Sequence, residues 1–227
     1  MELAPTSVSP PQLIIFDCDG VLVDSETLGC RAVSEMASEL GLTLSVEECE
    51  HSFRGVRMRE VLTALENRLG RPLPESFESE LRLRMAAAFR NHLRPIAGVR
   101  ETLDELSIPF CVASNGPMEK MHLTLEIAGL LPRFAGRIFS AYEVGVWKPN
   151  PGLYLHAAKS MGAEPSSCIV VEDSIIGVDA AVAAGMNVFG FAPSGDGSEL
   201  AAHGAVVFTS MKQLPALILV QAGVKCS

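Results

Sequence analysis

Three aspartates follow a short apolar run near the start of the chain. Asp17, Asp19 and Asp24 belong to the segment FDCDGVLVDSE, which begins at the end of the run QLIIF. Two carboxylates two positions apart, followed by Gly20, suit a tight turn at the carboxyl end of a buried strand, where such folds bind ligands. Taken alone, the same pattern also fits an Asp-rich loop that merely caps a helix.

Further polar side chains stand at the ends of later apolar runs. They are Ser114 and Asn115 after PFCVA, Lys148 before a proline-started helical stretch, and Glu172 and Asp173 in CIVVEDS. Each has an ordinary alternative as a helix cap, a surface charge or an acid favoured by a helix dipole. Together they would gather a hydroxyl, an amide, a lysine and carboxylates at one sheet edge. Clustered carboxylates repel and need a cation, and oxygen donors without His or Cys favour Mg²⁺.

Six short apolar runs would position these groups. They cover residues 12–16, 109–114, 137–141, 168–172, 187–192 and 205–210. The runs are continuous rather than alternating, which is typical of strands covered on both faces. Helical stretches that end in Gly, two of them with Pro in the first turn, lie between some of them. This alternation predicts an α/β fold with a doubly wound parallel sheet.

The region from Leu28 to Leu93 breaks this rhythm, because it contains helical patterning and no buried-strand run. Three apolar stripes have helical spacing. They are Leu28, Ala32, Met36 and Leu40; Met58, Leu62, Leu65 and Leu69; and Leu81, Met85 and Phe89. We therefore expect a helical cap over residues 28–93, inserted into a core formed by residues 1–27 and 94–227.

The composition excludes several classes of protein. The chain has 227 residues, a net charge of −9 and 48% hydrophobic residues, which suits a globular core without staples. Its negative charge argues against nucleic acid or anionic lipid as a partner. No apolar run reaches the roughly 20 residues of a membrane span. The six cysteines lack CxxC or zinc-like spacing and MELAPTSVSPP lacks a secretory pattern, so we expect reduced thiols, a frayed N-terminal tail and a cytoplasmic protein.

The sequence resembles the haloacid dehalogenase superfamily in four signatures that occur in the same order. They are Asp17-Cys18-Asp19-Gly20, Ser114-Asn115, Lys148 and Glu172-Asp173. The resemblance covers nearly the whole chain, with the helical insert in the place of that superfamily's cap and a Rossmann-like core around it. The segments SNGP, FSAYEVGVWKPNPGLYLHAAKSM and AAVAAGMNVFGF are similar to the bacterial 6-phosphogluconate phosphatases within it.

This resemblance implies a phosphatase that uses Mg²⁺, with another divalent ion such as Mn²⁺ as an alternative. Asp17 would be the nucleophile that forms an aspartyl-phosphate. Asp19 would protonate the leaving alcohol and then activate the attacking water. Ser114 and Lys148 would hold the phosphoryl oxygens. The implied metal donors are Asp17, the backbone carbonyl of Asp19 and Asp173, with Glu172 in a supporting position.

A predicted cap loop offers a second, cationic site. Arg54 and Arg57 flank Gly55 in the segment FRGVR, and such a pair could hold a phosphate or carboxylate in bidentate fashion. The alternative is that both are ordinary solvated arginines. Together with Asn115, these three residues are the predicted substrate-binding set. The expected partner is a small phosphorylated metabolite, a sugar or sugar-acid phosphate monoester, with 6-phosphogluconate as the leading candidate and Arg54 expected at its far end.

Two other functions stay open at this stage. The β-phosphoglucomutases share the fold and the four signatures, although this chain has Gly29 where those mutases carry a cap-hinge histidine. A non-catalytic phospho-acceptor of the receiver type is also doubly wound and binds magnesium. Receivers are shorter, lack the cap and carry the acceptor aspartate on a later strand. Asp19 itself favours phosphoryl transfer, since the dehalogenases of the superfamily lack an aspartate two residues after the nucleophile.

Overall fold

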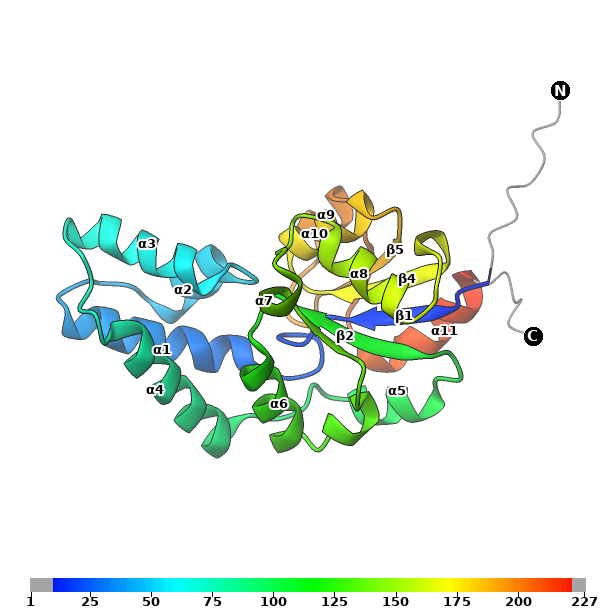
Figure 1. Ribbon diagram of the computed structural model, residues 1–227, viewed down its shortest axis with the longest axis horizontal. Helices are drawn as coiled ribbons and strands as arrows, with labels where there is room; N and C mark the ends of the chain where they lie inside the picture. The colour runs from blue at the N-terminus through cyan, green and yellow to red at the C-terminus, as the bar shows by residue number, and fades with distance from the viewer. Residues whose placement is uncertain (1–9, 222–227) are drawn as a thin grey trace, which may run out of the picture.

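The computed structural model describes residues 10–221, so the expectations for the first nine residues and for Cys226 lie outside it. Figure 1 shows an α/β core at one end of the molecule and a group of helices at the other. The five cysteines in the described part are free and buried, as the sequence predicts for small apolar side chains. Within the same residues, no helix is both long and apolar enough to cross a bilayer.

The core of the described chain is built on a parallel sheet with the strand order β3-β2-β1-β4-β5-β6. Its strands are β1 (Leu13–Phe16), β2 (Phe110–Ser114), β3 (Ile138–Ser140), β4 (Cys168–Glu172), β5 (Asn187–Phe191) and β6 (Val206–Phe208). Each lies in one of the predicted apolar runs. Because β2 and β4 flank β1, the strand ends that carry Asp17, Ser114 and Glu172 are neighbours.

Helices cover both faces of this sheet, which is why the strands are mainly apolar and carry their polar residues at their ends. Ile14 and Phe16 of β1 belong to one apolar cluster, whereas Leu13 and Ile15 belong to the other. The first cluster includes residues of α5, α6 and α11, and the second includes residues of α8 and α9. The core helices are α5 (Val99–Glu105), α6 (Met118–Ile127), α7 (Ala141–Val144), α8 (Gly152–Ser160), α9 (Ile175–Ala183), α10 (Ser198–Ala202) and α11 (Leu214–Gln221). The doubly wound parallel sheet is therefore confirmed.

Four helices form the cap between β1 and α5. They are α1 (Ser25–Glu39), α2 (Val46–Phe53), α3 (Met58–Leu69) and α4 (Phe77–His92). The three predicted stripes lie on α1, α3 and α4, and most of their residues pack into an apolar cluster within the cap. Leu28 and Phe89 pack instead with the apolar cluster of the core. Helix α2 has no apolar stripe in the sequence, because Cys49 is its only buried residue, and it was not predicted. Helix α1 begins at Ser25, earlier than the expected boundary, so the chain enters the cap almost directly from the aspartate loop.

Candidate active site

The aspartate loop after β1 touches the end of β4. Gly20 adopts a left-handed backbone with φ of 76°, and a Cβ at this position would lie 2.1 Å from Oδ2 of Asp173. Any larger residue would be strained and would displace that carboxylate. The glycine therefore allows Asp17 and Asp19 to approach Asp173, although they are far apart in the sequence.

Asp17 lies buried between charged groups of both signs. Its Oδ1 accepts a hydrogen bond from Nζ of Lys148 at 2.5 Å. Burial raises the pKa of Asp17 to about 8, and the nearby Glu172 and Asp19 add to this effect while Lys148 opposes it. The positive charge of Lys148 is therefore not enough to offset the burial of the Asp17 carboxylate and its acidic neighbours.

Asp19 has an electrostatic environment different from that of Asp17. The Ser25 hydroxyl donates to its Oδ1, and Nζ of Lys120 lies 2.9 Å from its Oδ2. Burial alone would raise the pKa of Asp19, but Lys120 and Ser25 outweigh it and hold the pKa below its usual value. Sequence analysis missed Lys120, whose signal is a lysine in the first turn of α6, a few residues after Asn115. The pKa values of these two neighbouring aspartates are therefore shifted in opposite directions, because Lys120 and Ser25 contact Asp19.

Lys148 connects the nucleophile candidate to the end of β4. Its side chain is 2% exposed, and Nζ donates to Oε1 of Glu172 at 2.5 Å as well as to Asp17. Glu172 also accepts from the Tyr154 hydroxyl at 2.8 Å and from the backbone N–H groups of Asp173 and Ser174, each at 3.0 Å. Both of its oxygens are therefore engaged within the protein. Glu172 therefore holds Lys148 in place, and its supporting position at a metal site stays a prediction.

Ser114 and Asn115 end β2 beside this cluster. The Ser114 hydroxyl accepts from the Gly116 N–H at 3.1 Å and lines the cavity described below. Asn115 accepts from the Lys148 N–H at 2.9 Å and donates through Nδ2 to the Gly55 carbonyl at 3.1 Å. It therefore connects the lysine loop of the core with the cap loop, a contact that the spacing of the sequence could not reveal.

The cap loop lies directly against the core. Gly55 has φ of 70°, and a Cβ there would lie 3.0 Å from Oγ of Ser174 at the start of α9. Arg54 places Nη1 3.3 Å from Oδ2 of Asp173, whereas the Arg57 guanidinium lies 3.9 Å from the centre of the Trp147 ring. Both arginines therefore already have partners in the core, instead of facing an open substrate space.

The carboxylates suit a hard cation. Burial, with Glu172 next in importance, raises the pKa of Asp173 well above its ordinary value even though Arg54 opposes the shift. Burial raises the pKa of Asp17 in the same direction, so a nearby cation would stabilise the charged form of both carboxylates. Among the described residues no group of three or more His, Cys, Asp or Glu side chains converges as a metal cluster. The donors that fit are two carboxylates, from Asp17 and Asp173, completed by the Asp19 backbone carbonyl and solvent, a set of oxygens that suits Mg²⁺.

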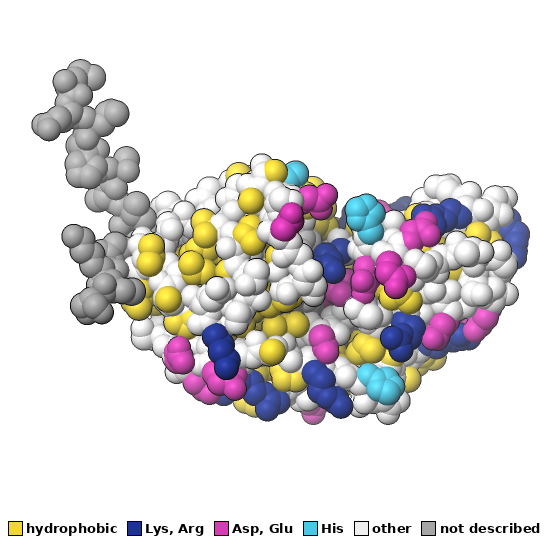
Figure 2. All heavy atoms as spheres, turned by 180° about the vertical axis from the view of Figure 1, so that it is seen from behind, with side chains coloured by type: hydrophobic (Ala, Val, Ile, Leu, Met, Phe, Trp, Pro, Cys, Tyr) yellow, Lys and Arg dark blue, Asp and Glu magenta, His cyan; other side chains and the backbone are white. Residues whose placement is uncertain are grey.

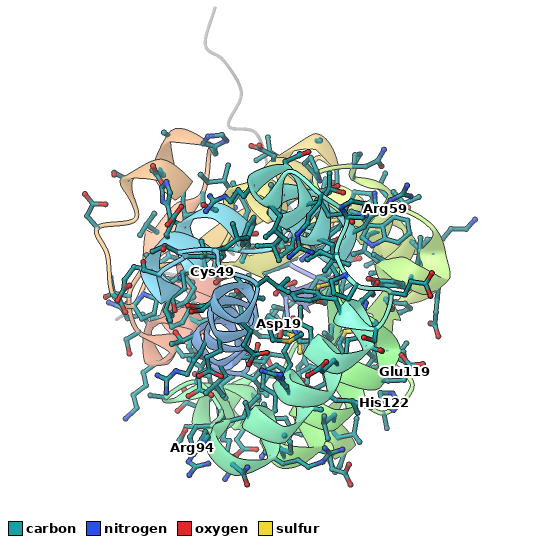
Figure 3. The ribbon with its side chains drawn as sticks, turned by 90° about the vertical axis from the view of Figure 1, so that its left-hand side faces the viewer. Asp19, Cys49, Arg59, Arg94, Glu119 and His122 are labelled. Atoms are coloured by element: carbon teal, nitrogen blue, oxygen red, sulfur yellow. The ribbon has the colours of Figure 1, made fainter. Side chains whose placement is uncertain are left out.

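A cavity of about 500 Å³ opens between the core and the cap. Figure 2 shows charged side chains of both signs gathered where the two parts meet. In Figure 3, which looks from the cap end, Asp19 lies near the centre, with Cys49 of the cap and Glu119 of the core on either side; all three line the cavity. A pocket of this kind suits a small molecule whose reacting group meets the aspartates and whose remainder faces the cap.

The chain is similar to known proteins in both sequence and structure. The family model of haloacid dehalogenase-like hydrolases matches residues 11–185. A 6-phosphogluconate phosphatase of Escherichia coli is 36% identical over 207 residues, covering 91% of this chain and 94% of that protein. The crystal structure of a haloacid dehalogenase-like protein of unknown function from Agrobacterium tumefaciens has a TM-score of 0.83 and 36% identity, covering 93% and 99% of the two chains. A putative β-phosphoglucomutase from Thermotoga maritima has a TM-score of 0.74 and 29% identity, covering 91% and 98%.

Proposed function

We propose that this chain uses Mg²⁺ to hydrolyse a small sugar-acid phosphate, with 6-phosphogluconate as the leading candidate. The chain belongs to the haloacid dehalogenase-like hydrolases and is a sugar-phosphate phosphatase. The observation that carries the proposed chemistry is the placement of Asp17. This buried carboxylate stands at the end of the central strand β1, with Lys148 on its Oδ1 and Asp19 beside it. The similarity to the Escherichia coli enzyme supports the choice of substrate.

The two aspartates divide the chemistry between them. In the first step an Asp17 oxygen attacks phosphorus, the bond from phosphorus to the alcohol oxygen breaks, and an aspartyl-phosphate forms. In its protonated form Asp19 gives its proton to the leaving alcohol. In the second step Asp19 takes a proton from a water molecule, whose oxygen attacks phosphorus while the bond to the Asp17 oxygen breaks, so that phosphate leaves and the Asp17 carboxylate is restored. Lys148 and the Ser114 hydroxyl hold the phosphoryl oxygens and offset their charge. Ser25 orients the Asp19 carboxylate for both transfers.

The metal and the cap loop complete the proposed site. Asp17, Asp173 and the Asp19 carbonyl would hold Mg²⁺, which supplies positive charge to the phosphoryl group when bound. Arg54, Gly55 and Arg57, fastened by Asn115, would close over the substrate and exclude water. Gly29 tells against a phosphomutase. It lines the cavity, and because glycine has no side chain this position offers no acid–base group. A Cβ there would lie 3.0 Å from Cε of Met85, so the neighbouring space is already filled.

A phosphate-release assay over a panel of sugar phosphates tests the proposal. The panel is run with Mg²⁺ and with EDTA, and we expect release only with the metal and most strongly from 6-phosphogluconate. Asp17→Asn should reduce turnover to the background rate, because an amide is a poor nucleophile, while its circular dichroism stays that of the wild type. Asp104→Asn, the same change at an exposed carboxylate of α5, is the control and should keep full activity. If Asp17→Asn retains most of the wild-type rate, the covalent mechanism is wrong.

A further inference from the structure

Arg82 of α4 is the arginine in the described lining of the cavity. The two cap-loop arginines do not line it. Arg54 contacts Asp173, and Arg57 covers the Trp147 ring. The arginine that lines the cavity therefore comes from a helix of the cap and not from the loop that the sequence indicated.

The Arg82 side chain is held in place by Glu78. Its Nε and Nη2 donate to Oε1 of Glu78, one turn earlier on α4, at 3.0 and 2.6 Å. Tyr142 of α7 lines the same cavity from the core. Burial would lower the pKa of Arg82, but the contacts with Glu78 and Tyr142 outweigh it, so the charge is retained. A guanidinium has five N–H donors, so the bonds to one Glu78 oxygen leave further donors for a ligand.

The other ionisable groups of the lining serve different parts of a ligand. Lys120 lies 2.9 Å from Asp19 and so belongs to the place where the leaving oxygen is protonated. Glu26 and Glu119 also line the cavity, and such acids accept hydrogen bonds from hydroxyl groups but repel anions. Lys148 is engaged by Asp17 and Glu172 at the phosphoryl end. Arg82 is thus the described lining cation that no catalytic carboxylate engages.

We infer that Arg82 binds an anionic group, a carboxylate, at the far end of the substrate and so determines the preference of the enzyme for sugar acids over neutral sugar phosphates. This inference rests on the proposed function, because it assumes that the phosphoryl group lies at Asp17. Bidentate geometry is the usual way in which arginine recognises a carboxylate. Because Glu78 already orders the Arg82 side chain, less conformational entropy is lost when a ligand binds, which favours binding.

The test compares two substrates that differ only at the carbon farthest from the phosphate. These are 6-phosphogluconate, which carries a carboxylate there, and glucitol 6-phosphate, which carries a hydroxymethyl group. We expect wild-type kcat/KM to favour the acid. In Arg82→Gln the ratio of the two kcat/KM values should fall by about 10-fold, the low end for hydrogen bonds to charged groups, because the side chain is 36% exposed. Most of the loss for the acid should appear in KM.

Two further variants separate substrate recognition from a structural role. Arg84→Gln removes an arginine of the same helix that pairs with Glu39 and Glu80 and does not line the cavity, and it should leave the ratio as in the wild type. Tyr142→Phe removes a hydroxyl from the core side of the cavity but keeps the charge of Arg82, and should also preserve the preference for the acid.

Three results would contradict the role inferred for Arg82 or the function on which it rests. If Arg82→Gln lowers kcat/KM for both substrates by the same factor, Arg82 only holds the cap against the core and the inference is wrong. It is equally wrong if the wild type does not prefer the acid, although the phosphatase assignment then stands. If the wild type releases phosphate from neither substrate nor from any other sugar phosphate, the proposed function itself has failed.

Discussion

Lys148→Met should lower the free energy of unfolding of the metal-free protein as well as impair catalysis. The side chain is 2% exposed, and Nζ lies 2.5 Å from oxygens of Asp17 and Glu172, whose side chains are 11% and 1% exposed. Methionine fills a similar volume without the charge. The substitution therefore leaves Glu172 buried without its cation and Asp17 without its lysine partner, the situation in which removal of one ion-pair partner is most costly.

The expected magnitude follows from this burial. Removing one partner of a buried, hydrogen-bonded ion pair costs about 3–5 kcal/mol, and the low exposure here leaves little solvent to screen the loss. For a chain of this size each kcal/mol lowers the melting temperature by about 2–4 °C, so the shift should be about 6–20 °C. Urea unfolding in EDTA measures the free energy of unfolding directly, and EDTA prevents a cation from replacing the lysine.

Two controls make this prediction specific. Lys159→Met changes an exposed lysine in the last turn of α8 and should alter the free energy of unfolding by less than about 0.5 kcal/mol. The double variant Lys148→Met/Glu172→Gln removes one of the uncompensated charges and should lose less than the sum of the single variants, by about 0.5–3 kcal/mol. A loss below about 1 kcal/mol in Lys148→Met, or strict additivity in the double variant, would refute the reasoning.

Two further predictions concern the aspartates. Asp19→Asn should slow hydrolysis of an alkyl phosphate by about 10²–10⁴-fold and that of p-nitrophenyl phosphate by much less, because a good leaving group needs little protonation; equal losses in steady-state assays would show that Asp19 is not the acid. Burial raises the pKa of Asp17 from 3.8 to about 8, so its contribution favours folding below pH 3.8 and is lost as the pH rises through about 8. Urea midpoints in EDTA should therefore fall over that range and change less in Asp17→Asn, whereas a midpoint that rose with pH would contradict this.

The sheet could be predicted because each strand carries its own signal. Residues of β1 alternate between two apolar clusters, so both faces are buried and the run LIIF contains no polar residue. The strand-end residues Asp17, Ser114 and Glu172 followed from the same signal, since parallel strands bring their carboxyl ends to one edge. Helix α2 could not be predicted, because a short helix with one buried residue has no apolar periodicity.

Pairing between distant side chains could not be predicted in this way. The sequence placed Arg54 and Arg57 in a loop, but their partners Asp173 and Trp147 come from core segments more than 80 positions away. The involvement of Arg82 was equally hidden, because its i,i+4 partner Glu78 gives it the appearance of a surface ion pair. Whether such an arginine faces a cleft depends on how the whole cap sits on the core.

The charges at the reaction centre connect closure of the cap with the need for a divalent cation. In the described structure four buried carboxylates line this part of the cavity. The carboxylates are Asp17, Asp19, Glu172 and Asp173, and the cations beside them are Lys148, Lys120 and Arg54. A phosphate group adds about 1.5 to 2 negative charges at neutral pH, so substrate would leave the site strongly negative without a further cation. Two positive charges bring it close to balance. Because Arg54 belongs to the cap loop, its share of this balance exists only while the cap lies against the core, and an open cap should bind both phosphate and substrate less well.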